Sequence, residues 1–184
     1  MNKFKKLLNI LFWILDKVDK KRYISLYPKY LKWLGINIDT KDVVGTWISP
    51  TVFWDSSGYS LISIGKSVTI SFDVSILVHD FSIVHAARAV GKEVIVRNSD
   101  ASKKGELKDR SIIKKKVCIG NNVFIGAKTL VLPGSTIGDN CIIGGGSVVT
   151  GVLEENSIYA GNPCKKIGNV EDFANKYHFL LEEM

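Results

Sequence analysis

Between residues 119 and 149 the sequence reads Ile119-Gly-Asn-Asn-Val-Phe, Ile125-Gly-Ala-Lys-Thr-Leu, Val131-Leu-Pro-Gly-Ser-Thr, Ile137-Gly-Asp-Asn-Cys-Ile, Ile143-Gly-Gly-Gly-Ser-Val and Val149. Every sixth residue is Ile or Val. The fourth residue after each is small or β-branched: Val123, Thr129, Ser135, Cys141 and Ser147. An earlier stretch repeats the pattern at Ile64, Ile70 and Ile76, and residues 48–52 resemble a degenerate copy. Such internal periodicity predicts a repetitive coil.

The period of six has a direct structural interpretation. Six residues make one short strand and one tight turn, so three units close a triangular coil of about eighteen residues. Each aliphatic side chain points into the prism and stacks on the residue one coil further on, so Ile119 should meet Ile137. Ile125 should meet Ile143 in the same way. The small residues lie near the corners, and Gly and Asn after the aliphatic residue permit turn geometry, including positive φ. Chance spacing in a β-sandwich is excluded, because strand alternation has a period of two.

The segments around this coil divide the chain. Residues 1 to about 35 show apolar residues at three- and four-residue intervals, which predicts helices, the second from Pro28 to Leu34 with its end at Gly35. We therefore expect a mainly β protein with an N-terminal helical segment (1–37), a β-helix domain (38–168) with a loop excursion (81–116), and a C-terminal helix (169–184).

The first helix allows two interpretations. Its apolar face can pack over the end of the coil, or it can lie on an anionic membrane surface through residues 1–22. The apolar stretch is shorter than the about 20 residues that a membrane-spanning helix needs, and no cleavable signal peptide is expected.

The charge is concentrated in one segment. The chain has a net charge of +7 and a pI of about 9.3. Between Ala86 and Lys116 lie ten Lys or Arg residues against four acids, and the remainder sums to nearly neutral. A solvated loop and the capture of coenzyme phosphates or an acidic saccharide both fit this segment. Nucleic acid is not an expected partner, because no aromatic stacking platform or recognition helix accompanies the charges.

Cysteine usage favours a cytoplasmic location. There are three cysteines, Cys118, Cys141 and Cys164, and this odd number without a disulfide framework predicts reduced thiols. Their spacing is not that of a zinc site, and no metal is expected.

Together with Val78-His79-Asp80 and Ile158-Tyr-Ala-Gly-Asn-Pro-Cys-Lys-Lys-Ile167, the ladder resembles the hexapeptide-repeat acyltransferases. It looks most like the branch of maltose, galactoside and exopolysaccharide O-acetyltransferases. The resemblance implies a left-handed parallel β-helix, a homotrimer with active sites between subunits, and acetyl-coenzyme A as the acyl donor.

His79 is the predicted catalytic residue. It lies where the ladder breaks, three residues after Ile76 and at the start of the excursion, and members of the family carry their catalytic histidine at this point. Imidazole can accept a proton from an acceptor hydroxyl and return it to the leaving thiolate near neutral pH.

For the donor site the resemblance implies a groove between coils of adjacent subunits. The positions that match its contacts are Phe124, Ala127, Gly145, Thr150, Gly151, Lys165 and Lys166. Gly168 stands where some relatives have an arginine, which is a departure from the phosphate contacts of the family.

Three further residues are candidates for acceptor contacts. Asp55 could orient His79, bind a sugar hydroxyl or form a turn, and Asp80 follows the catalytic position directly. His85 is either part of the excursion or an acceptor contact. A zinc site would need three converging histidines, and the third histidine of the chain, His178, is in the tail.

The sequence thus predicts an acetyl-coenzyme A-dependent O-acetyltransferase. The acceptor would be a saccharide hydroxyl of a capsule, exopolysaccharide or lipopolysaccharide sugar, acetylated directly in a ternary complex assisted by His79. The alternatives are N-acetyltransfer to an amino sugar or an antibiotic, and a non-catalytic scaffold on the same β-helix. We expect a cytoplasmic protein, with residues 1–22 as a candidate peripheral contact with the inner face of the membrane.

Overall fold

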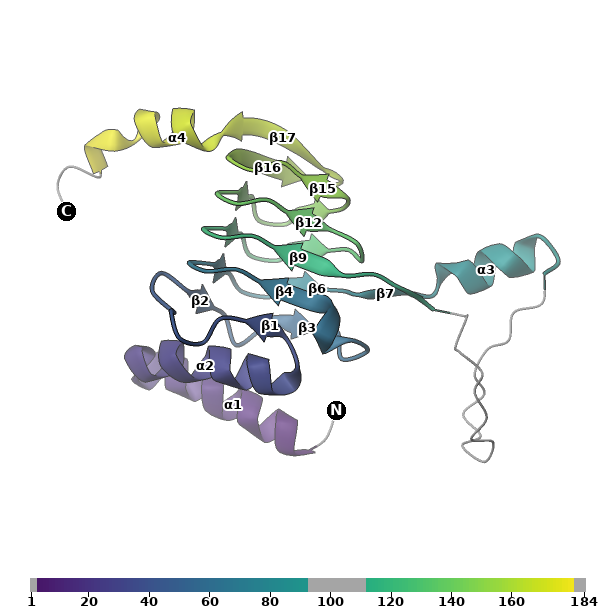
Figure 1. Ribbon diagram of the computed structural model, residues 1–184, viewed down its shortest axis with the longest axis horizontal. Helices are drawn as coiled ribbons and strands as arrows, with labels where there is room; N and C mark the ends of the chain where they lie inside the picture. Colours follow the sequence, from purple (N-terminus) through teal and green to yellow (C-terminus); the bar gives the residue numbers. More distant parts are fainter. Residues whose placement is uncertain (1–2, 93–111, 181–184) are drawn as a thin grey trace.

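The computed structural model describes residues 3–92 and 112–180 (Figure 1). Its centre is a stack of coils whose strands form three sheets, parallel throughout except for the last strand, β17, which is antiparallel to β16. The first sheet contains β1 (Asn37–Ile38), β4 (Ile62–Ile64), β9 (Val117–Ile119), β12 (Thr136–Ile137) and β15 (Val152–Leu153). The second contains β2 (Trp47–Ile48), β5 (Thr69–Ile70), β10 (Phe124–Ile125), β13 (Ile142–Ile143), β16 (Ser157–Gly161) and β17 (Cys164–Asn169). The third contains β3 (Phe53–Trp54), β6 (Ser75–Ile76), β11 (Leu130–Val131) and β14 (Val148–Val149).

The register of the strands confirms the predicted stacking. Ile119 pairs with Ile137, and Ile125 pairs with Ile143, each one coil further on. All four side chains are buried, so the aliphatic ladder forms the core of the prism. The degenerate repeat is also a true coil, because β2 pairs with β5 through Ile48 and Ile70.

The small positions are buried at the corners, as predicted. Where the residue is Thr or Ser, its hydroxyl group has a further role. Thr129 Oγ1 donates to the carbonyl of Gly126 at 2.7 Å, and Ser147 Oγ donates to the carbonyl of Gly144 at 2.6 Å. Each hydroxyl therefore satisfies a carbonyl three residues earlier that the turn leaves without a strand partner.

The glycines that directly follow the aliphatic residues do not have the positive φ that the sequence suggested. Positive φ falls two residues later, at Asn122 and Asn140 among others. The glycine is needed for close approach instead, since a Cβ on Gly126 would lie 2.5 Å from the backbone nitrogen of Gly145 in the next coil. The expectation of positive φ was right for the asparagines and wrong for the glycines.

Two helices cover the N-terminal end of the stack, α1 (Lys3–Val18) and α2 (Lys20–Leu34). The second begins eight residues before Pro28, its predicted start, because Asp19 caps it by accepting from the backbone N–H of Arg22 at 3.0 Å. Packing against the coil outweighs the cost of an internal proline. The predicted end at Gly35 is confirmed, with φ of 108°.

The excursion contains secondary structure that was not predicted. Strand β7 (His79–Asp80) pairs antiparallel with β8 (Ile113–Lys114), and helix α3 (Ser82–Ala89) follows β7 directly. Lysines 114–116 are exposed at its return, whereas Lys103 and Lys104 lie outside the described residues.

The C-terminal segment begins as the predicted helix. It comprises α4 (Val170–Lys176) and the 3-10 turn η2 (His178–Leu180). Figure 1 shows α4 extending from β17 at the end of the stack, and Phe173 and Tyr177 are exposed. The helix therefore extends away from the coil and leaves these two aromatic side chains in solvent. A second 3-10 turn, η1 (Tyr59–Leu61), precedes β4.

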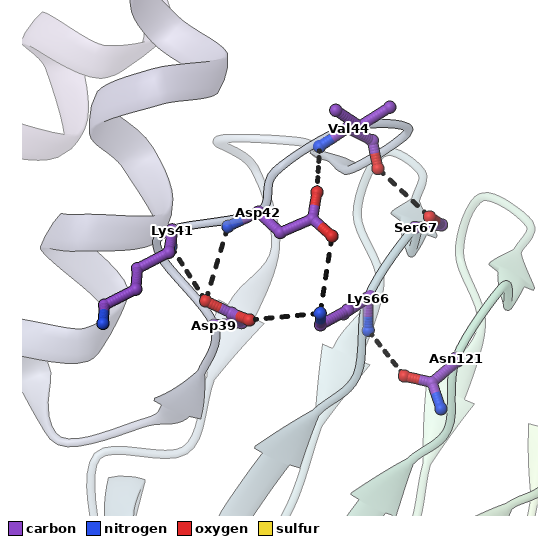
Figure 2. A network of polar contacts seen from close by, with 7 residues as sticks. All are labelled: Asp39, Lys41, Asp42, Val44, Lys66, Ser67 and Asn121. Atoms are coloured by element: carbon purple, nitrogen blue, oxygen red, sulfur yellow. Dashed lines mark hydrogen bonds and ion pairs between the residues drawn. The ribbon is translucent and has the colours of Figure 1, made fainter.

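Polar contacts link successive turns at the corner between the first and second sheets (Figure 2). Lys66 Nζ lies 3.7 Å from Asp39 Oδ2 and 3.4 Å from Asp42 Oδ2. The backbone N–H of Lys66 donates to Asn121 Oδ1 at 2.9 Å. Three coils are thus joined at this corner, which is distinct from the corner that holds His79.

Candidate active site

His79 lies at the corner between the third and first sheets, where the second coil ends. We call this corner the His79 edge; it comprises residues 55–61, 77–79, 132–135 and 150–151. The histidine pairs with Lys114 across β7 and β8, and the backbone N–H of Lys115 donates to the carbonyl of Val78 at 3.0 Å. These contacts fix the main chain of His79, and its side chain is 26% exposed.

Asp55 approaches the same ring from the previous coil. Its backbone N–H donates to the carbonyl of Ile76 at 3.1 Å, which fixes it beneath the end of β6. The buried carboxylate accepts from the backbone N–H groups of Val78 at 2.9 Å and of Ser57 at 3.0 Å. Asp55 Oδ2 is also hydrogen-bonded to His79 Nδ1. Of the three roles that the sequence left open for Asp55, this geometry favours orienting His79.

These donors keep Asp55 ionised. Burial alone would raise its pKa, but the hydrogen bonds from Val78, Ser57 and His79 outweigh it and lower the pKa to about 2. A permanent negative charge therefore faces Nδ1 of His79. Such a charge stabilises the imidazolium ion that forms when the ring accepts a proton.

Ser57 lies at the same ring nitrogen. Its Oγ is 2.9 Å from His79 Nδ1, on the nitrogen that Asp55 also engages. In a Ser–His–Asp triad the serine and the acid occupy opposite nitrogens. Here Nε2 is left with its lone pair, so the arrangement suits a general base acting on a bound hydroxyl and does not suit activation of Ser57 as a nucleophile.

The predicted donor residues divide between two edges and one face of the coil. Ala127 and Gly145 are stacked at the corner between the second and third sheets, where the N–H of Gly146 donates to the carbonyl of Ala127 at 2.8 Å. Thr150 and Gly151 lie on the His79 edge, two strand spacings from His79, roughly 10 Å along the stack. Phe124 is 42% exposed on the second sheet.

The segment after the ladder forms a hairpin between β16 and β17. Lys165 pairs with Ala160, and Lys166 Nζ lies 3.7 Å from Glu154 Oε2. The N–H of Gly161, at the turn, donates to Ser147 Oγ at 3.2 Å. The hairpin thus places both lysines at the C-terminal end of the stack.

Cys164 is part of this hairpin and is buried. Burial raises the pKa of its thiol, although a backbone hydrogen bond with Thr150 acts in the opposite direction. A buried thiol with a raised pKa is not a nucleophile, so Cys164 is a structural residue of the hairpin.

Sequence comparison places the chain among known proteins. The family described as bacterial transferase hexapeptide (six repeats) matches residues 116–151. Galactoside O-acetyltransferase of Escherichia coli (strain K12) is 34% identical over 140 residues, which cover 72% of this chain and 65% of that protein, slightly less than two thirds of its length. The chain therefore contains the hexapeptide repeat of bacterial transferases at residues 116–151.

Solved structures agree with this assignment for the fold. Maltose O-acetyltransferase from Clostridium difficile 630 superposes with a TM-score of 0.52 and 26% identity, covering 91% of this chain and 85% of that one. Galactoside acetyltransferase in complex with coenzyme A gives a TM-score of 0.53 and 23% identity, covering 93% and 83%. The coil of this protein is the left-handed parallel β-helix that the resemblance implied.

The other two predicted acceptor residues are exposed, Asp80 on β7 and His85 on α3. The carboxylate of Asp80 accepts from the backbone N–H and the hydroxyl of Ser82, at 2.7 and 2.9 Å, so it holds the start of α3. These bonds lower the pKa of Asp80. An acceptor contact by either residue stays a prediction.

Two residues of the site give no signal in the sequence. Ser57 carries no motif, and Lys114 belongs to a basic run without periodicity. Lys114 Nζ donates to the carbonyl of Ser57 at 3.1 Å and so ties the return strand of the excursion to the loop beside His79. Only the pairing of β7 with β8 reveals this contact.

The described residues contain neither a metal-binding cluster nor a membrane-spanning helix. Within residues 3–92 and 112–180, no three His, Cys, Asp or Glu side chains gather in a way that could hold a metal ion. None of the helices in these ranges has the length and apolarity needed to span a bilayer.

Proposed function

We propose that this transferase moves the acetyl group of acetyl-coenzyme A to a hydroxyl group of a saccharide. The observation that carries the proposal is the pairing of His79 Nδ1 with the buried, ionised Asp55, which leaves Nε2 available as a base. The identity to a galactoside O-acetyltransferase supports a sugar hydroxyl as the acceptor. The fold shared with a galactoside acetyltransferase in complex with coenzyme A supports the donor.

In the proposed reaction, donor and acceptor are bound together. Nε2 of His79 removes the proton of the acceptor hydroxyl as that oxygen forms a bond to the thioester carbon. The tetrahedral intermediate then expels the thiolate of coenzyme A, and the imidazolium returns the proton to the sulfur. Asp55 stabilises the imidazolium between these two steps.

We further propose that acetyl-coenzyme A lies in a groove between subunits of a homotrimer. Thr150 and Gly151 would border the arm of the donor on the His79 edge, whereas Ala127, Gly145 and Phe124 would contact it from the neighbouring subunit. Their division between separate edges supports a shared groove. Lys165 and Lys166 would meet the phosphates as cations.

The proposed setting is the synthesis of a capsule, exopolysaccharide or lipopolysaccharide sugar in the cytoplasm. Cys118, Cys141 and Cys164 are all free thiols, which supports a reducing compartment.

Product analysis tests the proposal. The purified chain is incubated with acetyl-coenzyme A and, in separate reactions, galactosides, maltose, acidic oligosaccharides, nucleotide sugars and amino sugars. Thiol release and product mass are measured, and the position of the acetyl group is determined by NMR. We expect an O-acetyl saccharide. Exclusive N-acetylation of the amino sugars, or the absence of thiol release with every acceptor, would overturn the proposal.

A further inference from the structure

Helix α1 carries more apolar side chains than the rest of the fold covers. On the inner side, Leu8, Phe12 and Leu15 pack against the core formed by α2 and the coil. Next to these, the helix carries large apolar residues that are between 45% and 79% exposed: Leu7, Ile10, Leu11, Trp13, Ile14 and Val18. We call these six residues the outer face of α1. A contiguous exposed apolar patch normally marks an interaction site, so the outer face requires a partner.

The outer face is one continuous stripe. Leu7, Ile10, Leu11, Ile14 and Val18 follow spacings of three and four residues, which place them along the same side of a helix, and Trp13 borders them. Figure 1 shows the helical pair at the N-terminal end of the stack, with α1 on the side away from the later coils. The stripe therefore faces outward from an end of the molecule.

The surroundings of this stripe are positively charged. Residues 1–35 contain nine Lys or Arg residues and two acids. Both acids are engaged within the fold: buried Asp16 accepts from Trp47 Nε1 at 3.0 Å, and Asp19 caps α2 and pairs with Arg22 at 3.6 Å. The exposed basic side chains of α2 include Lys21, Arg22, Lys29 and Lys32.

We propose that the outer face of α1 docks on an anionic lipid bilayer, with α1 lying in the plane of the interface. An apolar stripe with aromatic residues beside a basic surface has the chemistry of such interfacial helices. Trp13 and Trp33 are 51% and 62% exposed, and indole rings favour the headgroup region. A second copy of the chain fits less well, because it would bring the same basic segment against this one.

Co-sedimentation with vesicles tests the proposal. The full chain is mixed with vesicles of phosphatidylcholine alone or of phosphatidylcholine with phosphatidylglycerol. We expect binding to the anionic vesicles that weakens with added salt, and little binding to the neutral ones. The variant Ile10→Gln/Trp13→Gln should lower the partition coefficient by on the order of a hundredfold, because two inserted side chains are lost. Val152→Gln, which changes an exposed apolar residue of the coil, is the matched control and should bind as the wild type does.

The same samples test the alternative that a second copy of the chain covers the outer face. Circular dichroism checks that the variants are folded, and sedimentation equilibrium gives their mass. Failure of the wild type to bind anionic vesicles, or equal binding by Ile10→Gln/Trp13→Gln, would overturn the proposal. A fall in oligomer mass for this variant, without vesicle binding by the wild type, would assign the outer face to a contact between copies.

Discussion

At the scale of single residues, the proposed chemistry depends on which nitrogen of His79 is engaged. Asp55 and Ser57 both meet Nδ1, and Lys114 holds the Ser57 carbonyl from the return strand. These residues come from three segments that the coil brings to one corner. The site is therefore a base with a fixed orientation, and its parts can be removed one at a time.

Replacing Asp55 by Asn tests the orienting role. The neutral amide cannot stabilise the imidazolium, and its NH₂ group favours the wrong tautomer of His79. We expect kcat to fall on the order of 10²- to 10⁴-fold, with a small change in the KM for acetyl-coenzyme A. Asp73→Asn is the control, because this exposed turn residue has a φ of 57° that Asn tolerates. Equal rates for the two variants would remove Asp55 from the mechanism.

Ser57→Ala separates direct transfer from an acyl-enzyme. If Ser57 only assists in holding the ring and the carboxylate, its loss removes a neutral hydrogen bond, and the rate should fall by about tenfold or less. The intact mass of the wild-type protein after incubation with acetyl-coenzyme A should show no acetyl adduct. An adduct on the wild type that is missing in Ser57→Ala, together with complete loss of transfer, would favour an acyl-serine.

The residues of the site differ in how far the sequence could reveal them. His79 was found because it interrupts the ladder at a fixed place in a recognised pattern. Asp55 was one of several options, since only the stacking of one coil on the next brings it to a histidine 24 residues away. Ser57 and Lys114 leave no local signal, because their contacts depend on a loop and on a return strand that the period of six does not describe.

At the scale of elements, stability depends on the close approach of successive turns. A Cβ on Gly126 would lie 2.5 Å from the nitrogen of Gly145, and the atoms nearest to it all belong to the backbone, which cannot move aside as a flexible side chain can. Gly126→Ala should therefore lower the free energy of unfolding by about 1–3 kcal/mol, measured by urea denaturation. At Gly168 the nearest atom to an added Cβ is 3.8 Å away, so Gly168→Ala should change stability by less than about 0.5 kcal/mol. Equal effects would contradict the role assigned to Gly126.

The elements that repeat were predictable, and those that do not repeat were only partly so. The period of six specifies the stacking of Ile119 on Ile137 because every unit contributes the same signal. The predicted start of α2 at Pro28 was eight residues too late, because burial of Tyr23 and Tyr27 extends the helix on its N-terminal side. The pairing of β7 with β8 spans a long excursion and has no periodic signature.

At the scale of the whole molecule, a single chain leaves the proposed donor residues on separate edges. A trimer would bring the edges of different subunits together. Sedimentation equilibrium should therefore give the mass of three 20.4 kDa chains. Acetyl-coenzyme A binding should weaken when the protein is diluted until the trimer dissociates. A monomer that transfers acetyl groups at the full rate would contradict the shared groove.

The most direct test of the central claim is the rate of acceptor-dependent thiol release by His79→Ala. Binding of acetyl-coenzyme A, the fold and the oligomer mass are measured in parallel, and His178→Ala, in the 3-10 turn after α4, is the control. We expect His79→Ala to bind the donor normally and to release thiol on the order of 10²- to 10⁴-fold more slowly, whereas His178→Ala keeps the wild-type rate. A wild-type rate in His79→Ala would contradict the account.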